Sequence, residues 1–99
     1  MSRWAYVDRT FVPIGAQAIR VEDRGFQFAD GIYEVWSLWN GWLLDADLHL
    51  ARLRRSAAAI RIPFEACDRA LLAILRETVS RNRLKNGLVY LQLTRGAAV

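Results

Sequence analysis

The stretch IYEVWSLWNGWLL, from Ile32 to Leu44, decides the fold because it predicts a β-hairpin. Two apolar runs rich in β-forming residues flank Asn40-Gly41, the strongest two-residue signal for a type I′ turn. In such a turn Trp39 and Trp42 face each other across the two strands. Alternation with a period of two divides the first strand into two faces. One face carries Tyr33, Val35, Ser37 and Trp39, and the other carries Ile32, Glu34, Trp36 and Leu38.

The sequence before the hairpin predicts short strands followed by a loop. Residues 4–19 contain short alternating runs that are broken by Asp8, Pro13 and Gly15, which favours two or three strands in a meander. Residues 21–31 carry charges and two glycines without a helical or strand period. We therefore expect a loop directly before the hairpin.

The sequence after the hairpin predicts two helices and a last strand. Asp45 or Asp47 can cap a helix that runs to about Arg61, and a second apolar stripe predicts a helix over residues 65–82. Residues 88–95 are β-prone. This order predicts the α+β class: a two-layer sandwich in which both helices cover one face of a mostly antiparallel sheet.

Length and composition predict one cytoplasmic domain. The 99 residues, 54% of them hydrophobic, are enough for a single core. Cys67 is the only cysteine, so no internal disulfide can form, and we expect a small buried side chain in a reducing compartment. No apolar run approaches the roughly 20 residues that span a bilayer, so we expect no membrane partner.

The basic charge is a weak argument for a nucleic-acid partner. Thirteen arginines and one lysine, Lys85, outnumber 10 acidic residues, which gives a net charge of +4. A solvated helix face explains most of these arginines, and no aromatic-basic interleaving accompanies them. The arginines on or near the predicted helices are Arg54, Arg55, Arg61, Arg69, Arg76, Arg81 and Arg83. We expect no nucleic-acid binding.

One face of the first predicted helix indicates an anion site. Helical spacing places His49, Arg52, Leu53, Ser56 and Ile60 on the same side. An arginine beside the apolar stripe needs an anionic partner, because an unpaired desolvated charge is costly. A phosphate fits the two parallel donors of a guanidinium. Three carboxylates are the alternative partners for Arg52: Glu34, Asp30 and Asp23.

His49 and Tyr33, each taken alone, have ordinary structural explanations. His49 is expected to be a packed, hydrogen-bonded histidine, and no cysteine or carboxylate lies at metal-ligand spacing from it, so we predict no metal site. Tyr33 is expected to be a core tyrosine. Its hydroxyl would need a partner if buried, and a ligand in a cleft is one candidate.

Several motifs together resemble a known enzyme family. They are EDRGFQFADGIYE at 22–34, Asn40-Gly41, HLARL at 49–53 with Ser56, and YLQLTRG at 90–96. In order and spacing they resemble the class IV (fold-type IV) aminotransferases, which depend on pyridoxal 5′-phosphate (PLP). Within that family the chain is most similar to the D-amino-acid transaminases, and less similar to branched-chain aminotransferases and aminodeoxychorismate lyases.

The resemblance implies a role for four residues. Residues 1–99 would be the smaller N-terminal domain of a two-domain subunit that works as a homodimer and binds PLP between its domains. Arg52 matches the arginine that holds the cofactor phosphate. Tyr33 and Val35 match positions on the substrate side, and His49 matches a position that supports the cleft. The reaction would move an amino group between an amino acid, preferentially a D-amino acid, and a 2-oxo acid.

The resemblance also implies that essential parts lie outside residues 1–99. The lysine that forms the Schiff base with PLP belongs to the C-terminal domain, and Lys85 is expected to be a solvated turn residue. The arginine and histidine that bind the substrate carboxylate follow the last motif in the family. We therefore expect no catalytic residue in this chain and no activity from it alone. A non-catalytic interaction or oligomerisation module on the same scaffold is the alternative.

Overall fold

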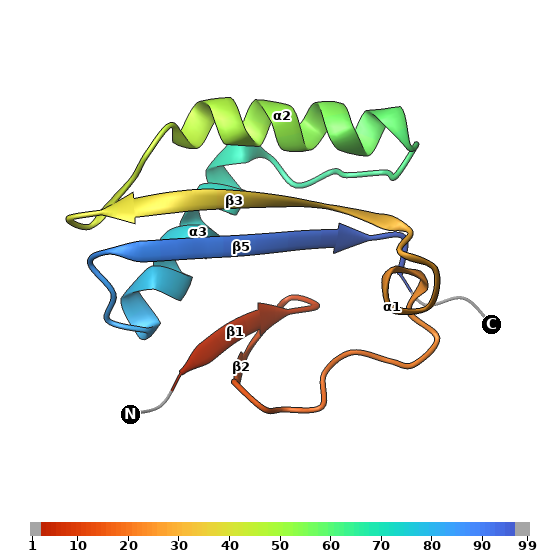
Figure 1. Cartoon of the computed structure of the whole chain (residues 1–99), viewed down its shortest axis with the longest axis horizontal. Helices are drawn as coiled ribbons and strands as arrows, with labels where there is room; N and C mark the ends of the chain where they lie inside the picture. Colours follow the sequence, from red (N-terminus) through yellow and green to blue (C-terminus); the bar gives the residue numbers. More distant parts are fainter. Residues whose placement is uncertain (1–2, 97–99) are drawn as a thin grey trace.

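A computed structural model describes residues 3–96 and contains two antiparallel sheets (Figure 1). In the main sheet β3 (Gly31–Trp39) lies between β4 (Trp42–Leu43) and β5 (Gly87–Thr94). A separate hairpin is formed by β1 (Trp4–Val7) and β2 (Thr10–Pro13). The α+β prediction is confirmed, with two sheets where one was expected.

The β3–β4 hairpin turns where the sequence predicts. Asn40 and Gly41 have φ values of 49° and 85°, the positive angles that a type I′ turn requires at both central residues. Trp39 pairs with Trp42 across the turn. Because the turn fixes the register, the alternation of β3 decides which side chains enter the core.

The core lies between the main sheet and two helices, α2 (Ala46–Ala59) and α3 (Asp68–Arg81). Figure 1 shows α2 running alongside β3. Both helices contribute leucines to one cluster on the same side of the sheet, as predicted. The cluster consists of Trp36, Leu50, Leu53, Leu71, Leu75 and Val89.

The two faces of β3 differ as the alternation predicts. Glu34, Trp36 and Leu38 are buried, whereas Tyr33 and Trp39 are both 66% exposed. The expectation that Tyr33 is a core tyrosine is wrong, because the helices cover only the opposite face. Its ring stacks on Tyr90 of β5, with 5.7 Å between the ring centroids.

The predicted loop before β3 contains a short helix, α1 (Arg24–Phe28). The Asp23 side chain accepts a hydrogen bond from the Gly25 backbone N–H, and Ala29 ends the helix in the left-handed conformation with φ 53°. The start of β3 then packs closely on β5: a Cβ at Gly31 would lie 2.8 Å from the Leu93 carbonyl oxygen. A five-residue helix has no periodicity to detect, which explains the error.

The helix ends also differ from the sequence-based boundaries. The first helix ends at Ala59, two residues early, and the second begins at Asp68, three residues late. Asp45 occupies the N-cap position of α2, but its side chain makes no capping hydrogen bond. Cys67 is exposed at the start of α3, so the expectation of a buried cysteine is wrong.

Arg95 ties three segments together at one end of the sheet. Its Nε donates to Asp30, just before β3, at 2.8 Å. Its Nη2 and Nη1 donate to the carbonyl oxygens of Ile60 and Arg61, at the end of α2, at 2.6 and 3.2 Å. The positions of β3 and α2 relative to each other are therefore fixed by hydrogen bonds as well as by the core. Within residues 3–96 no helix is long and apolar enough to cross a membrane.

Candidate functional site

A polar pocket lies where α2 faces β3. It has a cavity volume of about 290 Å³ and is lined by Tyr33, Glu34, Val35, Arg52 and Ser56. Three of the four predicted site residues, Tyr33, Val35 and Arg52, thus meet in one place. On this strand β4 pairs only with Leu38 and Trp39. Two further residues complete the lining: Glu34, one of the three alternative partners of Arg52, and Ser56, which shares its helix face.

An ion pair between a buried carboxylate and an exposed arginine lines this pocket. Glu34 is only 2% exposed, because strand alternation turns it toward the core. Arg52 approaches from α2: its Nε donates to Oε2 at 2.9 Å, and its Nη2 donates to Oε1 at 2.5 Å. This two-point geometry suits a guanidinium and a carboxylate and satisfies a charge that would be costly to bury alone.

The structure shows which of the three candidate carboxylates pairs with Arg52. Arg52 pairs with Glu34, whereas Asp30 binds Arg24 and Arg95, and Asp23 caps α1. The arginine side chain remains 60% exposed. Among residues 3–96 no protein acceptor pairs with its Nη1. An ion pair and an anion site are therefore compatible, because they use different edges of the guanidinium.

His49 completes a three-residue cluster. Its Nδ1 lies 2.7 Å from Oε1 of Glu34, and its side chain is 25% exposed beside Trp36. This confirms the expectation of a packed, hydrogen-bonded histidine. An ionised carboxylate can only accept hydrogen bonds, so Nδ1 must carry the proton that it donates to Glu34. The ring then presents Nε2 on its other side.

The charges of the cluster lower the pKa of the Glu34 carboxyl. The hydrogen bond from Arg52 is the main cause and brings the pKa from 4.5 to about 2, although burial acts in the opposite direction and His49 adds a smaller effect. The same contact raises the pKa of Arg52. At neutral pH the cluster therefore holds an ionised Glu34 against a fully charged guanidinium.

Acidification is expected to destabilise the fold through Glu34. Because the folded pKa is the lower one, the stabilisation is complete above pH 4.5 and is lost as the pH falls toward 2. At pH 3 this amounts to about 2 kcal/mol of the free energy of unfolding. Urea denaturation at pH 7 and pH 3 measures the loss. Glu34→Gln should no longer lose this stability between pH 7 and pH 3. Glu65→Gln, at an exposed position, should lose as much as the wild-type chain. Equal pH dependence in both variants would contradict the assignment to Glu34.

Lys85 lies away from the pocket. It belongs to the turn before β5, where its carbonyl oxygen accepts a hydrogen bond from the Gly41 N–H. This is the Asn40 end of β3, whereas the pocket lies near Tyr33, and seven strand residues span roughly 23 Å. The exposed position of Lys85 matches the expectation of a solvated turn lysine.

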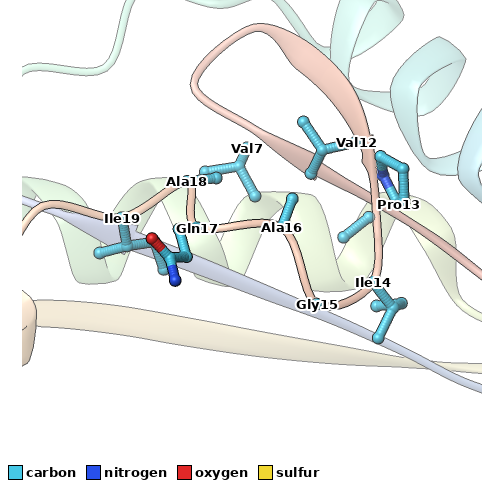
Figure 2. Close-up of a pocket in the computed structure, with 10 residues that line it drawn as sticks. Val7, Val12, Pro13, Ile14, Gly15, Ala16, Gln17, Ala18 and Ile19 are labelled. Carbon is cyan, nitrogen blue, oxygen red and sulfur yellow. The ribbon is translucent and has the colours of Figure 1, made fainter.

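A second hollow lies beside the β1–β2 hairpin and is lined almost entirely by apolar side chains. Figure 2 shows Val7 and Val12 of the hairpin near Ala16 and Ala18 of the segment that follows. Its lining residues carry no charge, and Gln17 is the one polar side chain among them. We therefore place the candidate site at the Arg52 pocket.

Comparison with known proteins identifies the family. The family model described as amino-transferase class IV matches residues 31–98, which include the whole pocket. The chain belongs to the class IV aminotransferases. This confirms the resemblance that the sequence motifs indicated.

Two curated relatives carry the same name. D-alanine aminotransferase of Bacillus licheniformis is 47% identical over 81 residues, which are 82% of this chain and 29% of the relative. The Staphylococcus haemolyticus protein of the same name is 33% identical over 93 residues, 94% of this chain and 33% of the relative. The chain thus spans about a third of the length of these relatives.

Solved structures of class IV proteins share the fold. A fold IV-transaminase from Curtobacterium pusillum superposes with a TM-score of 0.70 at 34% identity, covering 88% of this chain and 32% of that one. The branched-chain amino acid aminotransferase of Escherichia coli reaches a TM-score of 0.88 at 15% identity, covering 97% and 34%. The second likeness supports the architecture alone.

Proposed function

We propose that residues 1–99 form the N-terminal domain of a PLP-dependent aminotransferase that moves an amino group between a D-amino acid and a 2-oxo acid. The observation that carries the proposal is the pocket that the exposed Arg52 lines together with Tyr33 and Val35. The names of the curated relatives support the D-amino-acid preference. A branched-chain aminotransferase or an aminodeoxychorismate lyase is the alternative parent.

The residues of the pocket fit the phosphate of PLP. The Nη1 edge of Arg52 can donate to phosphate oxygens, and the Ser56 hydroxyl lies one helical turn away in the same pocket. PLP, when bound, supplies an electron sink for the carbon that loses its proton. In this proposal Arg52 binds the phosphate and Tyr33 and Val35 border the substrate. His49 supports the site through Glu34.

The proposal assigns no catalytic residue to this chain. The Schiff-base lysine would belong to a C-terminal domain that follows, and Lys85 is at the wrong end of β3. The partners would be that domain, a second subunit in a homodimer, and the amino acid and 2-oxo acid substrates, in the cytoplasm. No metal and no nucleic acid take part.

An experiment with the 99-residue chain tests both parts of the proposal. We expect the chain to bind PLP weakly through Arg52 and to form no pyruvate from D-alanine. Mass spectrometry after borohydride reduction should find no adduct at Lys85. A reduced Lys85 adduct together with pyruvate would overturn the claim that the chain lacks catalytic groups. For the parent, the coding sequence downstream of Val99 should contain an arginine and a histidine two residues apart and then a lysine in the second domain.

An interaction module on this scaffold is the second candidate, and the uncovered face of the main sheet favours it. Five large side chains on or beside this face are between 61% and 73% exposed, which is typical of surfaces that another protein covers. They are Tyr33, Trp39, Trp42, Leu88 and Tyr90. Sedimentation at several concentrations tests self-association, and a strictly monomeric chain at high concentration would count against it.

A further inference from the structure

The carboxylate of Glu34 holds the inner edge of Arg52. It binds Nε and Nη2, so the guanidinium plane is fixed at two points. It is itself held by the buried strand and by Nδ1 of His49 at 2.7 Å. The long side chain of Arg52 is 60% exposed and, without Glu34, would be one of the most mobile in the pocket.

Two opposing effects of Glu34 on anion binding follow from this geometry. Its negative charge repels a phosphate on the far side of Arg52, and this repulsion is small only where water screens the two charges from each other. Its hydrogen bonds order the arginine in advance, and ordering a free arginine side chain weakens binding by up to about thirtyfold. Because Arg52 is 60% exposed, water screens the repulsion but does not reduce the benefit of an arginine that is already ordered.

We propose that Glu34 is a positioning residue that turns the Nη1 edge of Arg52 into the pocket for a phosphate-bearing ligand, with His49 fixing the carboxylate from the other side. The inference rests on the proposed phosphate site at Arg52. It predicts that an acidic residue next to an anion site increases the affinity for the anion.

The Glu34→Gln variant tests the sign of this effect. Glutamine keeps the side-chain volume and removes the charge. Its amide N–H₂ is a donor, however, and would face the N–H groups of Arg52 or His49, which donate to the carboxylate in the wild-type chain. We expect the affinity for PLP and for inorganic phosphate to fall about five- to tenfold, as measured by calorimetry and by ³¹P NMR. Pyridoxal, which lacks the phosphate, should bind the variant and the wild-type chain equally. An unchanged or higher phosphate affinity would overturn the positioning role.

A second pair of variants covers the case in which Glu34→Gln does not fold. His49→Ala removes the donor that steadies Glu34, whereas His49→Asn can place an amide N–H near the position of Nδ1. We expect His49→Ala to lower the phosphate affinity and His49→Asn to restore it. The ¹H–¹⁵N signal of Arg52 Nε should broaden in the alanine variant only. Equal phosphate affinity in both variants would contradict the inference.

The wild-type chain distinguishes this inference from the proposed function. If the wild-type chain binds neither PLP nor phosphate, the proposed site at Arg52 is overturned, and the positioning role of Glu34 with it. If the wild-type chain binds both ligands and Glu34→Gln binds them at least as tightly, only the positioning role is overturned. Urea denaturation of each variant confirms that folded proteins are compared.

Discussion

Replacing Trp36 by alanine is expected to lower the free energy of unfolding by about 3–5 kcal/mol, the usual cost of emptying a buried aromatic site. The indole is completely buried at the centre of the core, between the leucines of α2 and α3. Its Nε1 also donates to the Ala46 carbonyl oxygen at 3.4 Å. A chain of this length has a total stability of about 5–15 kcal/mol, so the variant would lose about a fifth of it or more.

Urea denaturation followed by circular dichroism measures this loss. Trp39→Ala is the matched control. Trp39 belongs to the same strand but lies on its opposite face, where the side chain is 66% exposed. Its contribution comes from the cross-strand pair with Trp42, and its removal should cost less than about 1 kcal/mol. Similar losses in both variants would show that the burial of Trp36 does not hold the two layers together.

Replacing Arg52 by alanine is expected to lower the affinity for PLP by about ten- to hundredfold. Each charge-assisted hydrogen bond from a guanidinium to a phosphate contributes a factor of this order. Arg52→Lys should retain part of the affinity, since an ammonium keeps the charge but lacks the two parallel donors. Titration of the PLP absorbance with each variant gives the three dissociation constants.

The control for Arg52 comes from the same helix. Arg55 is exposed and lies outside the pocket, so Arg55→Ala removes one positive charge without touching the site. We expect its affinity for PLP to change by less than about twofold, because exposed charges at a distance are screened by salt. If Arg55→Ala and Arg52→Ala weakened binding equally, the attraction would be the net charge of the chain and not a site at Arg52.

Local chemistry made much of the architecture predictable. Asn40-Gly41 sets a turn of one handedness, and a period of two then assigns Glu34 and Trp36 to the covered face. The spacing of apolar residues in α2 and α3 likewise requires that one side of each helix is buried and the other is exposed to solvent. Each of these signals acts between residues close in sequence, so it can be recognised without knowledge of the fold.

The errors share a physical cause. The α1 helix is too short to form on its own, and it depends on Arg24, whose N–H reaches the Gly96 carbonyl oxygen from the far end of the chain. The exposure of Tyr33 depends on which face the helices cover, and its stacking on Tyr90 depends on the register of β5. These contacts join residues far apart in the sequence, so no local sequence pattern predicts them.

The candidate site divides in the same way. By itself the sequence determined that Arg52 lies on the sheetward face of a helix and needs an anion, and its motifs determined the family. Only the tertiary structure decided which anion Arg52 meets inside the protein, because Glu34, Asp30 and Asp23 are equally acceptable by charge. The packing of α2 along β3 brings Glu34 and not the others within hydrogen-bond distance, and Arg52 still lines the pocket.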